Sequence, residues 1–289
     1  MTIRYDYAIT HGGKAHRDDF LASCIALATG ARAVERRNPD ADEVINPAVL
    51  ILDVGGQHDP DKSNFDHHHL SRDSAPTCAL TLYLRHLGLE GQFRRLGWLE
   101  PTELLDSKGP MQYGRAYGLS PENVFRTFSP VEEALLDEFS TRERVLGYPL
   151  HNSLTGVDFI DSLGEVMKAL GKRLLDDATK LQADVERLQR QAQLVDVAGV
   201  TCMVIPSKDT NGSREFRKEF APTVAVSISH DDRGSGWALF RYDDDPRVDF
   251  SRLEGNPAVM FAHKGGFIAK TSSLLPLDEV LDLVRASLR

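Results

Sequence analysis

The chain has 289 residues, of which 41% are hydrophobic and 27% are charged. This composition is ordinary for a soluble globular protein and leaves little room for a large disordered fraction, while the length favours two packed units over one. The formal net charge of −9 argues against tight, non-specific binding to nucleic acid, because such binding requires cations that neutralise phosphates.

The apolar runs, the N-terminus and the cysteines indicate the compartment in which the protein is expected. No uninterrupted apolar run is long enough to span a bilayer, and the N-terminus lacks the basic start, apolar core and cleavage site of a secretory signal. Cys24, Cys78 and Cys202 are odd in number and far apart, which suits a reducing compartment better than a disulfide framework. We therefore expect a cytoplasmic protein with no membrane partner.

Strands and helices alternate in the first part of the chain. Residues 5–10 predict a short strand, and the sequence DDFLASCIALAT from Asp18 predicts a helix. The apolar run AVLILD predicts a buried strand that ends at Asp53, just before Gly55-Gly56. A third strand-to-loop transition is predicted in SNFDHHH, and TCALTLYLRHLG predicts a helix that Gly88 ends. This order predicts an α/β fold, a mostly parallel sheet covered by helices, with ligands at the carboxyl edge of its strands.

The second half of the chain predicts a long helix and a smaller unit. Helices are expected from about Pro130 to Val145 and from Leu163 to Ala192, and the second keeps an apolar stripe opposite a charged face. Ordinary core or interdomain packing explains the stripe, and homodimer formation is the alternative. The segments VTCMVIP, TVAVSIS and GWALFRY predict strands of a mixed α/β unit, to which the long helix would be the connection.

The loop after the first predicted strand holds three candidate metal ligands. His11, His16 and Asp18 fall within eight residues, beside two glycines that allow a tight turn. Imidazole and carboxylate groups suit divalent metals such as Mn²⁺, and the absence of thiolate argues against a soft metal. Alternatively, these are surface residues, and Asp18 or Asp19 serves only as a favourable acid at the helix N-terminus.

Two further acidic sites follow. Asp53 ends an apolar strand, where a carboxylate is costly to bury unless it is paired, hydrogen-bonded or bound to metal. In Asp66-His67-His68 one imidazole could bind metal while its neighbour, on the other side of an extended backbone, serves another role. Asp66 could orient a ring as a supporting partner.

These motifs resemble the DHH phosphoesterase superfamily, which is named for the Asp-His-His triplet, and within it the MYG family, the melanocyte-proliferating-gene proteins once labelled metal-dependent protein hydrolases. Residues 10–19, THGGKAHRDD, follow the family's T-H-N-G-x-F-H-x-D-E, with departures at Gly12, Ala15 and Asp19. Residues 53–60 match D-V-G-G-x-x-D-P, and residues 261–269, FAHKGGFIA, resemble the late H-x-x-G-F-I segment.

The resemblance implies roles for particular residues. The implied metal ligands are His11, His16, Asp18, Asp53, His67 and Asp106, of which Asp106 has the weakest match, since Ser107-Lys108 replaces the family's Asn-Gly. His68 would contact substrate phosphate or assist proton transfer, with Asp66 in support. His263, Lys264, Gly265 and Gly266 would hold substrate phosphate, although a glycine-rich turn before Phe267 explains the same residues.

Together, the residues and the resemblance predict a divalent-metal-dependent phosphoester hydrolase. Two ions, Mn²⁺ by preference or else Mg²⁺, would activate water, with Asp53 as the bridging ligand. The expected substrate is RNA or a short oligonucleotide, cleaved by a phosphodiesterase or 3′–5′ exonuclease. The alternatives are a small phosphate compound such as pyrophosphate or a nucleotide, which the acidic charge favours, and a metal- or nucleotide-binding regulator that has lost catalysis. In this interpretation residues 1–150 form the catalytic domain, 151–192 the connecting helical segment and 193–289 the substrate-binding domain.

Overall fold

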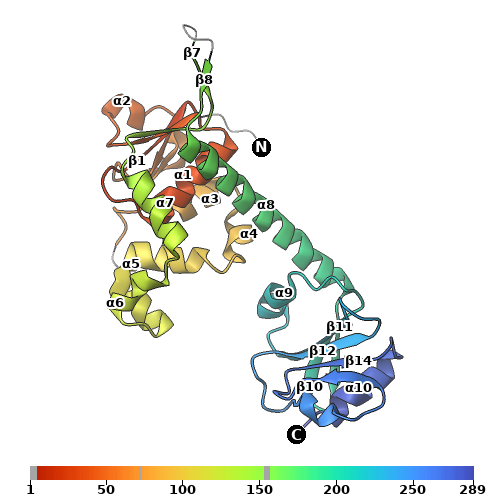
Figure 1. Ribbon diagram of the computed structural model, residues 1–289. Helices are drawn as coiled ribbons and strands as arrows, with labels where there is room; N and C mark the ends of the chain where they lie inside the picture. Colours follow the sequence, from red (N-terminus) through yellow and green to blue (C-terminus); the bar gives the residue numbers. More distant parts are fainter. Residues whose placement is uncertain (1–4, 72, 153–156) are drawn as a thin grey trace. The chain divides into compact units, whose positions relative to one another are not determined.

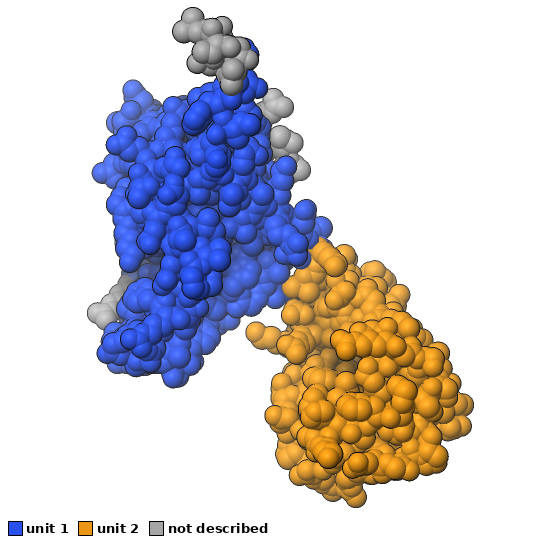
Figure 2. All heavy atoms as spheres, viewed as in Figure 1, with its two compact units in different colours: residues 1–179 blue, residues 180–289 orange. Residues whose placement is uncertain are grey.

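The computed structural model describes residues 5–71, 73–152 and 157–289. The chain divides into two compact units, unit 1 (Met1–Thr179) and unit 2 (Lys180–Arg289), which are coloured separately in Figure 2. The division falls inside the long helix α8 (Ser162–Gln191). Among the described residues, no helix combines the length and apolar character needed to cross a membrane. The three functional segments expected from the sequence stay a prediction.

Unit 1, drawn in red to green in Figure 1, is built on a six-stranded sheet with the order β4-β5-β3-β1-β2-β6. Its four central strands pair in parallel; they are β5 (Asn64–Phe65), β3 (Val49–Leu52), β1 (Tyr7–Thr10) and β2 (Ala33–Arg36). The two edge strands, β4 (His58–Asp59) and β6 (Arg144–Leu146), pair antiparallel with their neighbours. All four residues of β3 are buried, as expected for a parallel strand covered on both faces. The prediction of a mostly parallel sheet is confirmed.

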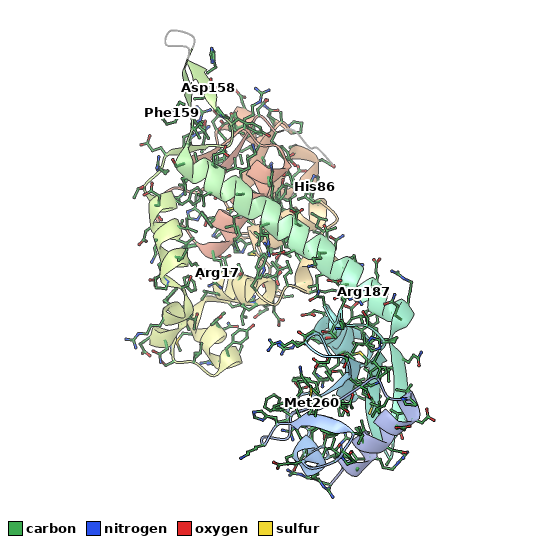
Figure 3. All side chains as sticks on the ribbon, turned by 45° about the vertical axis from the view of Figure 1, so that its right-hand side comes forward. Arg17, His86, Asp158, Phe159, Arg187 and Met260 are labelled. Atoms are coloured by element: carbon green, nitrogen blue, oxygen red, sulfur yellow. The ribbon has the colours of Figure 1, made fainter. Side chains whose placement is uncertain are left out.

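Helices surround this sheet in unit 1. They are α1 (Arg17–Thr29), α2 (Ala41–Val44), α3 (Ala79–His86), α4 (Glu90–Arg94), α5 (Leu99–Tyr117), α6 (Pro121–Val124) and α7 (Pro130–Ser140), with short 3₁₀ turns at Pro60–Lys62 and Phe125–Thr127. α1 is apolar on most of its surface and lies deep in the core. α8 approaches it so closely that a Cβ on Gly171 would overlap the carbonyl oxygen of Cys24. A small hairpin of β7 (Leu150–Asn152) and β8 (Val157–Phe159) completes the unit, and the Phe159 side chain is exposed (Figure 3).

Two predicted boundaries need correction. The helix expected from Pro130 to Val145 ends at Ser140, because Arg144–Leu146 form β6 and pair with β2. The first strand begins at Tyr7 instead of Tyr5. In contrast, the long helix expected from Leu163 to Ala192 agrees with α8 to within one residue at each end.

Unit 2 contains a second six-stranded sheet, with the order β13-β14-β12-β11-β10-β9. The strands are β9 (Gln193–Val197), β10 (Val200–Ile205), β11 (Val224–His230), β12 (Trp237–Arg241), β13 (Val259–Ala262) and β14 (Ile268–Thr271). β10 and β11 pair in parallel and the other described pairs are antiparallel, so the predicted mixed unit is confirmed. A 3₁₀ turn spans Phe250–Leu253.

The two faces of this sheet are covered differently. Along β10, Val204 packs with Val280 of α10 (Leu277–Ala286), whereas Met203 packs in a separate cluster with Val185 of α8 and Phe216 of α9 (Ser213–Phe220). Successive side chains of a strand point to opposite faces, so α10 covers one face, while α9 and the end of α8 cover the other face at β10.

Candidate metal centre

Polar side chains gather where three parallel strands of unit 1 end. His11 follows the last residue of β1, Asp53 follows β3, and His67 lies two residues after β5. Parallel pairing brings these carboxyl ends to one edge of the sheet. Asp53 leaves the strand in a left-handed conformation with φ 58°, while its N–H still donates to the carbonyl of Phe65 at 3.1 Å.

Asp53 lies at the centre of the resulting cluster. Its Oδ2 atom is 3.5 Å from Nε2 of His11, and its Oδ1 atom is 3.0 Å from Nε2 of His67. Asp106, on α5, places Oδ2 2.9 Å from the same His67 nitrogen and Oδ1 3.7 Å from Nδ1 of His16. The structure therefore brings Asp106 to this edge despite its weak sequence match.

The ligand atoms form three overlapping groups, each of which fits within 4.8 Å and contains Asp53. One group adds His11 and His16, and a second adds the two histidines of the triplet. The third consists of His16, Asp18, Asp53 and Asp106. The structure thus collects all six residues that the sequence singled out as candidate ligands.

Burial of unpaired polar atoms shows that this cluster suits a cation. Asp18 is 0% exposed and Asp53 is 2% exposed. Within the described part of the chain, no hydrogen bond reaches either oxygen of Asp18 or Nε2 of His11, while Oδ1 of Asp53 and Oδ2 of Asp106 both face Nε2 of His67. Buried carboxylates are costly unless they are paired or coordinate a metal, and this mixture of oxygen and imidazole nitrogen fits a divalent ion such as Mn²⁺.

The same crowding shifts the pKa values of the cluster. Burial, and then the charges of Asp53 and Asp106, raise the pKa of Asp18 well above its usual range. Burial alone would lower the pKa of His67, but the carboxylates of Asp106 and Asp53 outweigh it and raise that pKa to about 10. Burial would raise the pKa of Asp106, but the adjacent His67 holds it below its usual value. Without metal, His67 is the cation that balances these acids.

The Asp66-His67-His68 triplet differs from the expected alternation. The rings of His67 and His68 lie on the same side, with centroids 4.6 Å apart, because the backbone has left β5 and turns after Phe65. Both oxygens of Asp66 have partners: one accepts the N–H of Gly56 at 2.6 Å, and the other contacts Nδ1 of His68 at 2.6 Å. Gly56 adopts φ 74°, a conformation that favours glycine, so the glycine pair serves this turn.

Two residues of the site were not singled out by the sequence. Asp19 is fully buried, and its carboxylate accepts the N–H of His16 at 2.7 Å, as a helix-terminal acid should, but its Oδ2 atom also lies 3.5 Å from Nε2 of His11. Burial raises the pKa of Asp19 to about 7, although the charge of His11 opposes this shift. Arg36, at the end of β2, lies 3.8 Å from Asp19 and donates to the carbonyls of Gly13 and Phe139, each at 3.0 Å. No motif marks Arg36; its importance comes only from the pairing of β2 with β1.

The glycine-rich segment of unit 2 forms a turn between β13 and β14. The N–H of Gly265 donates to Nδ1 of His263 at 2.9 Å, and the imidazole lies against Phe267 with centroids 4.2 Å apart. Gly266 has φ 69°, and a Cβ there would overlap the carboxylate of Asp249. The turn explains these glycines locally, and a role of His263, Lys264, Gly265 and Gly266 toward substrate phosphate stays a prediction.

Comparison with solved structures finds similar chains at low sequence identity. A pGpG-specific phosphodiesterase, PggH from Vibrio cholerae, has a TM-score of 0.30 and 13% identity over 97% of this chain and 99% of its own. A DHH domain described as a member of the s1p family of ribosomal proteins has a TM-score of 0.32 and 12% identity over 97% and 85%. RecJ in complex with Mn²⁺ from Thermus thermophilus has a TM-score of 0.31 and 12% identity over 96% of this chain and 51% of RecJ.

No curated protein matches the sequence. Residues 7–79, which include the first loop, Asp53 and the Asp-His-His triplet, match the model of a protein family named MYG1_exonuc. That family is described as uncharacterised protein family UPF0160.

Proposed function

We propose that unit 1 is a divalent-metal-dependent phosphodiester hydrolase that acts on RNA or short oligonucleotides. The observation that carries this proposal is the position of Asp53 between two sets of ligand atoms. His11 faces one oxygen of its carboxylate and His67 faces the other, at 3.5 and 3.0 Å. A carboxylate shared in this way is the usual bridge of a two-metal site.

The remaining residues divide between the two sides of Asp53. His11 and His16 would hold one ion, and His67 the other, while Asp18 and Asp106 add oxygen ligands from α1 and α5. When bound, two such ions lower the pKa of water and stabilise negative charge on the oxygens of a phosphoryl group. The protein then needs no serine or cysteine nucleophile, which agrees with the absence of a GxSxG or GxxxxGK[ST] motif in the sequence.

His68 is suited to act on the substrate. Its side chain is 61% exposed, and Asp66 holds its Nδ1 atom at 2.6 Å. With Nδ1 occupied, Nε2 is the ring atom left to bind a phosphate oxygen or to transfer a proton. Asp66 is therefore a positioning residue, and His68 is the candidate catalytic residue.

The test is hydrolysis of an RNA 5-mer by the full chain in Mn²⁺, compared with Asp53→Asn. We expect the wild type to release mononucleotides and the variant to lose at least about 100-fold in rate, since the bridge is removed. The matched control is Asp61→Asn, an exposed acid of the same segment, which should keep full activity. Unchanged activity of Asp53→Asn would refute the bridging role.

A second candidate substrate is a small phosphate compound such as pyrophosphate or a nucleotide. The net charge of −9 favours it, because long polyanions are repelled more strongly than small ones. Assaying RNA 5-mers, pyrophosphate and mononucleotides side by side separates the two, since a pyrophosphatase should leave the oligomers intact. Stoichiometric metal binding without turnover of any of them would contradict the hydrolase proposal and favour a regulatory protein.

A further inference from the structure

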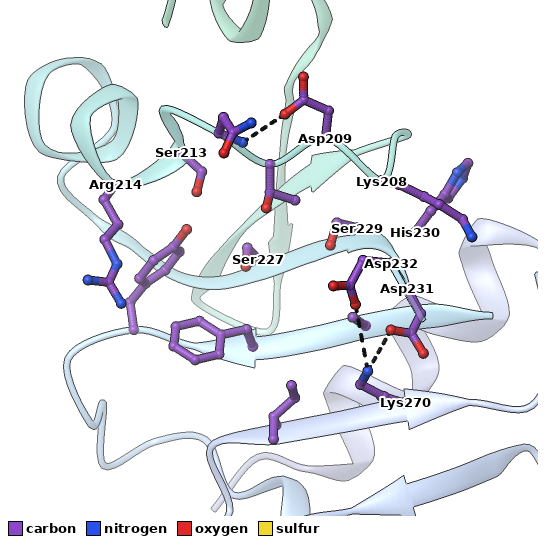
Figure 4. A pocket seen from close by; sticks show the side chains of 16 residues that line it. Lys208, Asp209, Ser213, Arg214, Ser227, Ser229, His230, Asp231, Asp232 and Lys270 are labelled. Atoms are coloured by element: carbon purple, nitrogen blue, oxygen red, sulfur yellow. Dashed lines mark hydrogen bonds and ion pairs between the residues drawn. The ribbon is translucent and has the colours of Figure 1, made fainter. Parts of the chain in front are cut away.

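A cavity of about 680 Å³ lies on the sheet of unit 2, and the His263–Gly266 turn does not line it. Its floor consists of side chains from β11, β12 and β14, and its wall is the segment 208–214, which leads into α9 (Figure 4). The volume falls within the range of about 300 to 1,000 Å³ that is usual for small-molecule sites.

Three residues that line this cavity carry a hydroxyl group and are about nine-tenths buried or more. Ser227 is 9% exposed, Ser229 is 8% exposed and Tyr242 is 7% exposed, and all three line the cavity. Figure 4 shows Ser227 and Ser229 on the strand that forms its floor. No described residue forms a hydrogen bond with any of these hydroxyls, so they are available to a ligand in the cavity. A polar ligand in the cavity would satisfy them.

The N-terminus of α9 provides positive charge at the wall. Its cap is Gly212, which has no side chain to accept a hydrogen bond from the first turn. The backbone N–H groups of Arg214 and Glu215 find no acceptor among the described residues, and neither does the guanidinium of Arg214, which lines the cavity. Unpaired N–H groups at a helix N-terminus together with a guanidinium form a good phosphate site.

The acidic residues around the cavity contact cations. Lys270 contacts Asp231 at 2.5 Å and Asp232 at 4.0 Å (Figure 4). Arg187 of α8, labelled in Figure 3, contacts Asp209 at 3.3 Å and also donates to the carbonyls of Asp209 and Asn211, at 3.0 and 3.2 Å. These bonds hold the wall segment in place, so little ordering is needed when a ligand binds.

We propose that this cavity binds a nucleoside monophosphate. Its phosphate would lie at the N-terminus of α9 beside Arg214, its ribose hydroxyls would meet Ser227 and Ser229, and its base would stack on the partly exposed ring of Phe240. Base stacking on an aromatic ring tolerates any base, so the site recognises the class of ligand, not one nucleotide. The cavity is formed by unit 2 and the metal centre by unit 1, so the proposal does not depend on the proposed hydrolysis.

The experiment is isothermal titration calorimetry of the full chain with adenosine monophosphate, in a chelator that keeps divalent metal from the metal centre. We expect saturable binding of one molecule per chain, and weaker binding of adenosine and of inorganic phosphate, each of which keeps only part of the contacts. Arg214→Ala should weaken binding of the monophosphate about tenfold or more, since a charge-assisted contact to phosphate is lost. Ser229→Ala should weaken it less and leave the circular dichroism spectrum unchanged.

Two controls place the ligand. Lys218→Ala removes an exposed cation from the same helix that does not line the cavity, and Asp53→Asn alters the metal centre; both should bind adenosine monophosphate as the wild type does. The proposal is overturned if the wild type shows no saturable binding, or if Arg214→Ala binds as tightly as Lys218→Ala. Binding that is lost in Asp53→Asn and kept in Arg214→Ala would also overturn it, because the ligand would then lie at the metal centre.

Discussion

Asp18 should strengthen metal binding but lower the stability of the metal-free protein. Its carboxylate is fully buried and has no hydrogen-bond partner among the described residues. Burial, and then the charges of Asp53 and Asp106, raise its pKa well above the usual range. A carboxyl group with a raised folded-state pKa stabilises the fold below its unfolded pKa of about 3.9, and this contribution is lost as the pH rises through the folded pKa. Replacement of Asp18 by the uncharged Asn should therefore raise the unfolding free energy of the metal-free protein at neutral and higher pH.

The magnitude follows from the removed charge. One unit of pKa shift corresponds to about 1.4 kcal/mol, so metal-free Asp18→Asn should exceed the wild type in unfolding free energy by at least about that amount at pH 8, and by little at pH 4. Each kcal/mol corresponds to about 2 to 4 °C in Tm for a unit of this size. With Mn²⁺ at 100 times its Kd, the wild type should gain about 2.7 kcal/mol. Mn²⁺ should stabilise the variant much less, so with metal bound the wild type should be the more stable of the two proteins.

Differential scanning calorimetry at pH 4 and pH 8, with chelator or with Mn²⁺, measures all four differences. Asp137→Asn is the matched control, because this acid lies on the exposed side of α7 and should change neither Tm nor the response to Mn²⁺. A metal-free Asp18→Asn protein that melts below the wild type at pH 8 would refute the reasoning. So would a variant that Mn²⁺ stabilises as much as the wild type.

Three further predictions follow from the core and the site. The pKa of His67 is raised to about 10, and only the neutral ring can bind a metal, so Mn²⁺ affinity should rise by up to about tenfold per pH unit between pH 6 and 8. Calorimetry in two buffers should detect the released proton, and a pH-independent Kd would contradict this. Arg36→Met should lower the free energy of unfolding in urea by about 3 to 5 kcal/mol, and adding Asp19→Asn should restore part of this stability, because the Arg36–Asp19 pair is buried. Equal losses of stability in the single and double variants would exclude coupling between the two residues. Gly171→Ala should lower the free energy of unfolding by about 1 to 3 kcal/mol, because the new Cβ would clash with α1. Gly91→Ala, which has open space around it, should be neutral or slightly stabilising. Similar melting temperatures of the two variants would show that the contact between α8 and α1 is loose.

Much of the metal centre could be predicted because its residues sit at recognisable boundaries. Asp53 ends an apolar run and precedes two glycines, and a parallel sheet brings such strand ends together whatever the details of packing. His11 and His67 follow strand ends in the same way. Local sequence order was therefore enough to collect these three residues at one edge.

Other parts of the site depend on contacts that no local pattern contains. Asp106 reaches His67 because α5 packs on α1, and the segment around LLDSKGP gives no strong helix signal. Arg36 matters only because β2 lies next to β1. The end of α7 differs from the prediction for the same reason. The apolar spacing continues to Val145, but residues from Arg144 onward form β6 and pair with β2. Long-range pairing decides these features.

Anomalous scattering from a crystal of the full chain grown with Mn²⁺ tests the two-metal centre most directly. The account predicts two manganese peaks about 3.5 to 4 Å apart, both in contact with the carboxylate of Asp53, one on the side of His11 and the other on the side of His67. A single peak, or two peaks that do not share Asp53, would contradict it.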